Sequence, residues 1–86
     1  GYTNVVVSPV PNNGNLTLTF YNPFDNENGY IEIRDSRNKL VYQQNENFIK
    51  GNNIFNLSIF NAENGLYTIR IIGKHNYATK EIMVVK

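Results

Sequence analysis

The sequence predicts an all-β fold class, a single immunoglobulin-like antiparallel β-sandwich of about seven strands. Apolar and polar residues alternate along most of the short apolar segments, as they do in strands that bury one face. Clusters of asparagine, glycine and proline interrupt these segments about every 8 to 12 residues, a spacing typical of sandwiches. No long segment carries the apolar stripe of a helix. An open barrel is the weaker alternative.

The first two strands are predicted at residues 4–7 and 15–21. The first is mainly a run of valines, whose β-branched side chains favour extended backbone. In the second, Leu16, Leu18 and Phe20 share one face, and polar residues or tyrosine occupy the other. The second segment is therefore expected to bury one face in the core.

The next two strands are predicted at residues 30–35 and 40–44, joined as a hairpin. Ile31 and Ile33 are expected to face inward, with polar or tyrosine side chains between them. Asn38 suits the connecting turn because asparagine tolerates left-handed backbone angles.

The last three strands are predicted at residues 53–60, 66–73 and 81–85. Alternation defines the first two. The third is apolar at almost every position, and its β-branched content and short length favour a strand over a helix. The inward positions of the first two are Phe55, Leu57, Ile59, Tyr67, Ile69 and Ile71.

Asparagine accounts for 16 of the 86 residues, far above ordinary usage. We expect most of them in turns, because asparagine and glycine accept the backbone angles that reverse a chain. The strongest predictions of a chain reversal are at the three Asn-Gly pairs, Asn13-Gly14, Asn28-Gly29 and Asn64-Gly65. Turns are expected at residues 9–14, 22–23, 26–29, 46–47, 50–52, 61–65 and 74–76.

The composition argues against several classes of partner and chemistry. The chain contains no cysteine, which removes disulfides, thiolate metal sites and a cysteine nucleophile. Eight basic and seven acidic residues are scattered along it, so we expect no nucleic-acid partner. Its apolar runs are far shorter than the about 20 residues needed to span a bilayer, so we expect no membrane insertion.

No constellation of residues points to catalysis, and we expect no enzyme activity, metal site or cofactor. His75 is expected in a polar turn, without a serine or aspartate at a triad-like spacing. Residues 25–29 superficially resemble a calcium loop but lack its glycine and glutamate at the required positions. The acidic residues are expected in turns or on outward strand faces: Asp25, Glu27, Glu32, Asp35, Glu46, Glu63 and Glu81.

A binding module is an alternative hypothesis. Tyr21, Tyr30 and Tyr42 are expected at outward positions of their strands, where they could form a platform that stacks on carbohydrate. Tyrosine is also a favoured cross-strand partner on any exposed sheet face. A structural sandwich appended to a bacterial enzyme is the other alternative.

Three motifs follow one another along the chain. Pro9-Val10-Pro11 precedes Gly14 and an alternating strand. The hairpin follows at residues 29–41, and Gly51 then leads through an alternating strand into Gly65-Leu66-Tyr67. The chain ends with Lys80, an apolar run and Lys86.

The order, spacing and position of these motifs resemble the type A C-terminal sorting domain of proteins exported by the type IX secretion system (Por secretion system) of Bacteroidetes, over residues 5–86. Val10 stands where the family usually has asparagine, and Asn38 where it generally has glycine. Phe60 and Ala62 replace a small polar residue and a leucine.

The resemblance implies a non-enzymatic C-terminal secretion signal for an N-terminal cargo domain of the same polypeptide. Residues 1–86 are expected to form one sorting domain, with Gly1 a possible remnant of expression. The implied partners are the type IX translocon, an outer-membrane shuttle protein and a sortase that removes the domain and joins the cargo to lipopolysaccharide. The implied location is the periplasm in transit, then the cell surface or the medium.

The resemblance also carries over a sorting motif. Gly65 is expected to be a turn glycine, and Tyr67 an inward tyrosine whose hydroxyl bonds the backbone. The apolar run at residues 82–85 is expected either to be simply the last core strand or to present its backbone to a partner by strand addition. The motif residues are Pro9, Pro11, Gly14, Gly65, Tyr67, Lys80 and Lys86.

Overall fold

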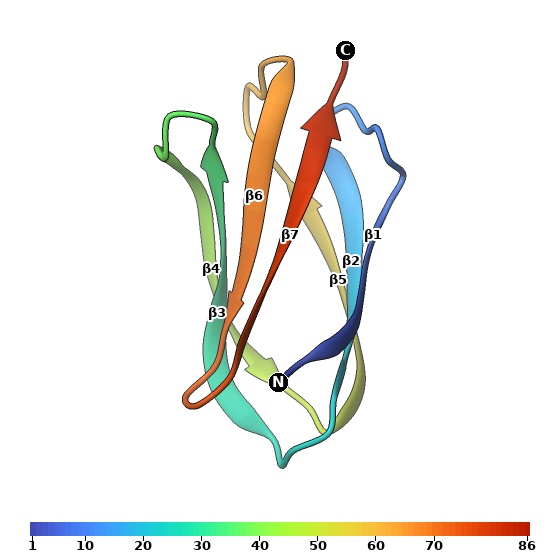
Figure 1. Ribbon diagram of the computed structural model, residues 1–86, viewed down its shortest axis with the longest axis vertical. Coiled ribbons are helices and arrows are strands. Elements are labelled where there is room, and N and C mark those ends of the chain that lie inside the picture. Colours follow the sequence, from blue (N-terminus) through green and yellow to red (C-terminus); the bar gives the residue numbers. More distant parts are fainter.

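The computed structural model describes residues 1–86 and confirms the all-β fold class, with seven strands in two antiparallel sheets and no helix. Figure 1 shows the two sheets facing each other as a sandwich. Consequently, no helix is present that is long and apolar enough to cross a membrane. The strands are β1 (Thr3–Ser8), β2 (Asn15–Asn22), β3 (Glu27–Asp35), β4 (Leu40–Phe48), β5 (Gly51–Ser58), β6 (Gly65–Ile72) and β7 (Tyr77–Val84).

The strand order is β1-β2-β5 in one sheet and β4-β3-β6-β7 in the other. Because β1, β5, β4 and β7 are edge strands, the sandwich has two open sides. On one of them, an isolated parallel bridge between Asn12 and Val84 links the segment after β1 to the end of β7. This bridge ties the two sheets together near the C-terminus.

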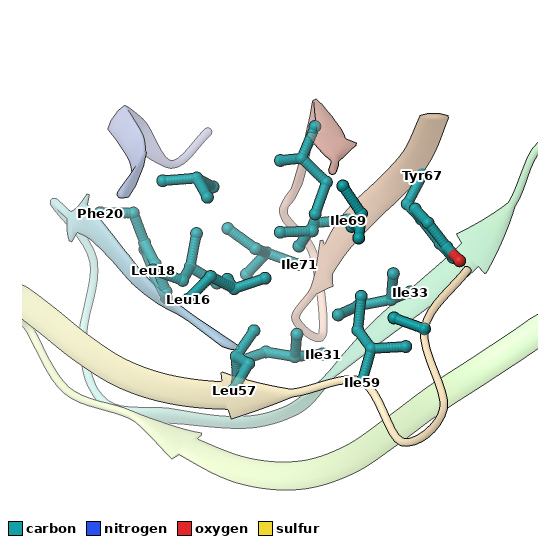
Figure 2. Close-up of a cluster of buried hydrophobic side chains, with 14 of the residues drawn as sticks. Leu16, Leu18, Phe20, Ile31, Ile33, Leu57, Ile59, Tyr67, Ile69 and Ile71 are labelled. Atoms are coloured by element: carbon teal, nitrogen blue, oxygen red, sulfur yellow. The ribbon is translucent and has the colours of Figure 1, made fainter. Parts of the chain in front are cut away.

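The core consists of the inward positions that alternation predicts. Figure 2 shows side chains of both sheets meeting between the layers, among them Leu18 from β2 and Ile31 and Ile69 from the opposite sheet. These three side chains are completely buried. Burying an aliphatic side chain of this size contributes about 1.5 to 3 kcal/mol, so such residues supply much of the stability of the fold.

Aromatic side chains fill the end of the sandwich where β1 begins. Tyr2, Phe20, Phe48 and Phe55 pack with ring centroids 5.1 to 6.1 Å apart, and we call this region the aromatic end. The Tyr2 hydroxyl donates a hydrogen bond to the carboxylate of Glu27. Burial, together with the hydrogen bond and the charge of Glu27, holds the pKa of Tyr2 well above its usual value.

Two predicted turns are wrong, because β3 and β4 are longer than predicted. Asn28-Gly29 lies inside β3, paired with Asn47 and Glu46 of β4. A Cβ at Gly29 would lie 2.6 Å from the ring of Phe48 and even closer to the backbone of Ile72. The glycine is thus required by close packing within a strand, and not by a chain reversal.

The last strand also differs from its prediction, since β7 begins at Tyr77 and not at residue 81. Its apolar end does alternate in three dimensions. Ile82 and Val84 are buried, whereas Met83 and Val85 are exposed. The sequence hides this alternation because both faces of the strand carry apolar side chains.

Glu32 lies at the outward strand position predicted for it, yet it is buried. Its side chain points outward from β3, but it is only 7% exposed, because two arginines cover it. Arg34 and Arg70 each approach its carboxylate to 3.3 Å. Arg34 lies two residues further along β3 itself and Arg70 lies opposite Glu32 on β6, both on the same face, so an outward position at the centre of a sheet is not necessarily a solvated one.

Candidate functional site

Six of the seven predicted motif residues lie at one end of the sandwich. We call this region the motif end and define it as residues 9–14 after β1, residues 59–64 between β5 and β6, residues 65–67 at the beginning of β6, and residues 85–86 after β7. Figure 1 shows the C-terminus beside the β1–β2 connection at the end opposite the N-terminus. The exception is Lys80, which lies in β7.

Tyr67 fixes the β5–β6 loop from inside. Its ring is 6% exposed, and its hydroxyl donates a 2.7 Å hydrogen bond to the carbonyl of Glu63. The same hydroxyl accepts a 3.0 Å bond from the backbone N–H of Glu63. The expected bond between an inward tyrosine and the backbone is therefore confirmed, and the arrangement matches the tyrosine corner of immunoglobulin-like sandwiches.

Two motif glycines have backbone angles that disfavour other residues. Gly65 has φ +149°, and a Cβ added there would meet no neighbouring atom. Glycine is therefore needed at this position only for its backbone angle. Gly14 has φ +105°, and a Cβ there would lie 3.0 Å from the Cβ of Ala62. Gly14 also accepts a 2.8 Å backbone bond from the N–H of Ile59, so it joins the β1–β2 and β5–β6 loops.

Asn12, which is not among the predicted motif residues, holds the Pro-x-Pro loop in place through its side chain. Its side chain is buried, its Oδ1 accepts a 2.9 Å bond from the N–H of Gly14, and its Nδ2 donates a 3.2 Å bond to the carbonyl of Pro9. The first of these bonds is an Asx turn, which an asparagine two residues before a glycine in a predicted turn could have suggested.

The residues after β7 are held from two sides. The N–H of Asn12 donates to the carbonyl of Met83 at 3.2 Å, and its carbonyl accepts from the N–H of Val85 at 2.8 Å. The N–H of Lys86 donates to Oδ1 of Asn64 at 2.8 Å. This contact was not predictable from local sequence patterns, because 22 residues separate Asn64 from Lys86.

Several apolar side chains at the motif end remain in contact with solvent. Val10 is 58% exposed, Val85 is 51% exposed, and both prolines of the Pro-x-Pro turn are exposed. Phe60, in the β5–β6 loop, is the most exposed large hydrophobic residue of the chain, at 87%. The motif end therefore combines a fixed backbone with apolar side chains that nothing in the chain covers.

Lys80 occupies a different environment. It pairs with Ile69 in the β6–β7 ladder and shares the inward parity of Ile82, yet it is exposed, because β7 is an edge strand. An inward-pointing charge on an edge strand hinders pairing with another strand. Lys80 therefore disfavours strand addition along the middle of β7.

The three tyrosines proposed for carbohydrate stacking do not share a surface. Tyr21 lies in the β1-β2-β5 sheet, whereas Tyr30 lies in the opposite sheet. Tyr42 pairs with Ile33 and packs against the core, after an irregularity in the β3–β4 register. Burial raises the pKa of Tyr42, and the charge of Glu46 adds to this. The predicted platform is therefore wrong.

The remaining chemical candidates are structural. His75 is exposed in the turn between β6 and β7, as expected. In the segment compared with a calcium loop, Asn26 accepts a 2.7 Å bond from the N–H of Lys50, and Glu27 bonds Tyr2. No group of three or more histidine, aspartate or glutamate side chains is placed to hold a metal ion.

Comparison with known families identifies one match. The model of the family described as "Secretion system C-terminal sorting domain" matches residues 6–86. The match includes all seven predicted motif residues and extends through the C-terminus of the chain. A search of curated proteins finds no match.

Proposed function

The chain belongs to the family of type IX secretion C-terminal sorting domains, and from this membership we propose that its motif end is the surface that the secretion machinery reads. A domain of this family is a type IX sorting signal for an N-terminal cargo and is not itself catalytic. It implies export across the outer membrane, to the cell surface or the medium.

The proposal rests on the observation that the motif residues come together at one end of the sandwich. Pro9, Pro11 and Gly14 lie far from Gly65 and Lys86 in the sequence, but direct hydrogen bonds join the segments at which they stand. Each of these bonds fixes backbone, so the loops hold one shape and leave apolar side chains exposed. Exposed apolar side chains on a rigid framework are typical of surfaces that bind proteins.

Family membership also motivates the finer steps of the proposal. The domain folds in the periplasm, where an outer-membrane shuttle protein and the type IX translocon bind the motif end. A sortase then separates the domain from its cargo and joins the cargo to lipopolysaccharide. In this scheme residues 1–86 act as one unit, and Lys80 contributes by keeping β7 from pairing with other chains.

A fusion experiment tests the sorting function. Residues 2–86 are joined to the C-terminus of a periplasmic reporter in a host with an active type IX system, and the reporter is measured in the periplasm, on the surface and in the medium. Export that is lost in a translocon-deficient strain is the expected result. An intact, protease-resistant fusion that stays in the periplasm of the active strain would contradict the proposal.

A second pair of fusions tests the role of the motif end. Replacing both Val10 and Val85 with serine removes exposed apolar surface without touching the core, so export should fall while the fold persists. Replacing the exposed Ile54, which lies on the outer face of β5, is the matched control. If Ile54→Ser reduces export as much as the paired change, the motif end has no special role.

A further inference from the structure

Residues 85–86 extend past the end of the sheet, yet their backbone is fixed. The last pair of the β6–β7 ladder joins Gly65 to Val84, so the two residues beyond it have no strand partner. Terminal residues of this kind usually fray. Here the N–H groups of both Val85 and Lys86 donate hydrogen bonds of 2.8 Å.

The two acceptors differ in what else they do. Asn12 offers its backbone carbonyl to Val85, and its buried side chain also holds the Pro-x-Pro loop. Asn64 offers its side-chain oxygen to Lys86, and this is the only side-chain hydrogen bond that Asn64 makes. Asn64 is also exposed, so its side chain contributes little to the packing of the fold.

We infer that Asn64 is a positioning residue for sorting, which holds the final residue of the chain against the motif end. This inference rests on the proposed function. The partner then meets the C-terminal residues as part of a folded surface, with Val85 and Lys86 held next to the Pro-x-Pro loop, and not as a mobile peptide. Neither Asn12 nor Asn64 belongs to the predicted sorting motif.

The chain offers matched variants for a test. Asn64→Ala removes the acceptor, whereas Asn64→Asp keeps an oxygen at the same position. Asn26→Ala is the control, because Asn26 lies outside the motif end, is also exposed, and its Oδ1 accepts a comparable 2.7 Å bond from a distant backbone N–H, that of Lys50.

Two readouts separate positioning from folding. Amide exchange of Lys86 and Ile69, measured by NMR on the chain of residues 1–86, reports on the terminus and on the core. Export of the full cargo protein reports on sorting. Since one neutral hydrogen bond shifts an opening equilibrium about fivefold, Asn64→Ala should speed Lys86 exchange by about that factor and lower export, with Ile69 unchanged. Asn64→Asp should leave Lys86 exchange and export close to those of the unaltered chain, and Asn26→Ala should change neither.

Other outcomes would overturn the inference. Unchanged Lys86 exchange in Asn64→Ala would mean that Asn64 does not hold the terminus. Faster Lys86 exchange with normal export would mean that the machinery does not need a fixed terminus. Equal loss of protection at Ile69 would make Asn64 a structural residue. Failure of the unaltered cargo protein to be exported would contradict the proposed function itself, which distinguishes the two hypotheses.

Discussion

The two ends of the sandwich are stabilised by different forces. At the aromatic end, the four rings of Tyr2, Phe20, Phe48 and Phe55 pack closely, and Phe48 is completely buried. At the motif end, hydrogen bonds from asparagine, tyrosine and backbone groups fix the loops, and apolar side chains remain exposed. At an end held by packing, the apolar side chains are buried against one another. At an end held by hydrogen bonds, they stay exposed and can contact a partner.

The largest expected difference between the ends comes from truncating a phenylalanine. Phe48→Ala should lower the free energy of unfolding by about 3 to 5 kcal/mol, because it leaves a cavity among packed rings. Phe60→Ala, at the exposed motif end, should change it by less than about 0.5 kcal/mol. Urea unfolding measures both values. Similar losses for the two variants would contradict the contrast between the ends.

Glycine substitutions should come next. Gly65→Ala places a side chain at φ +149° and should cost about 1 to 3 kcal/mol through backbone strain alone, since nothing lies near the new Cβ. At the other end, Gly29→Ala should also be destabilising, but through overlap with Phe48 and the backbone of Ile72. Thermal unfolding measures both losses. Combining Gly29→Ala with Phe48→Leu should recover part of the loss, and no recovery would argue against overlap with the ring.

Removing a single hydroxyl should have a smaller effect. Tyr67→Phe keeps the buried ring but deletes both hydrogen bonds to Glu63, which should cost about 1 to 2 kcal/mol and loosen the β5–β6 loop. Amide exchange of Glu63 reports on the loop directly. Faster exchange at Glu63 with β2 unaffected is the expected result, whereas loss of protection throughout the chain would show that the hydroxyl supports the whole fold.

The smallest expected effect is a pH dependence at the β3–β4 turn. A hydrogen bond from the N–H of Lys39 lowers the pKa of Asp35, and the N–H and charge of Arg37 add to this. Because the folded pKa lies below the unfolded one, the ionised carboxylate stabilises the fold above its unfolded pKa of about 3.9, and this stability is lost as pH falls through the folded value.

The Asp35→Asn variant isolates that contribution. Unfolding free energies of the variant and the unaltered chain should differ at about pH 6 and converge as the pH falls below the folded pKa of Asp35. The turn lies at the same end of the sandwich as the motif, so export should be measured in parallel. A difference that stays constant as the pH falls would show that the charge of Asp35 is not its cause.

The alternation of apolar and polar residues along the strands predicted most of the core. It failed where a register irregularity or close packing changed the local structure. Alternation identified Leu18, Ile31 and Ile69 as buried, because each lies on the inward face of its strand. It placed Tyr42 incorrectly, since an irregularity in the β3–β4 register changes which side chains face the core. Gly29 was assigned to a turn because the sequence alone does not distinguish a flexible glycine from one on which an aromatic ring packs.

The candidate site was predictable where its causes are local. The roles of Gly65 and Tyr67 could be predicted from the sequence because both are local. Gly65 has a positive φ where the β5–β6 loop ends, and the hydroxyl of Tyr67 bonds a residue only four positions away. Asn12 and Asn64 were not identified, because their partners at the end of β7 lie far along the chain. Among 16 asparagines, composition gave no reason to distinguish these two.

The sequence by itself determined the number of strands, most of their inward positions and the family to which the chain belongs. Only the tertiary structure decided that the Pro-x-Pro turn, the tyrosine corner and the C-terminus form one surface, and that Lys80 lies apart from it. The physical reason is that alternation and turn preferences act within a few residues. The meeting of Asn12 with Val85 depends instead on how two packed sheets bring the ends of β1 and β7 together.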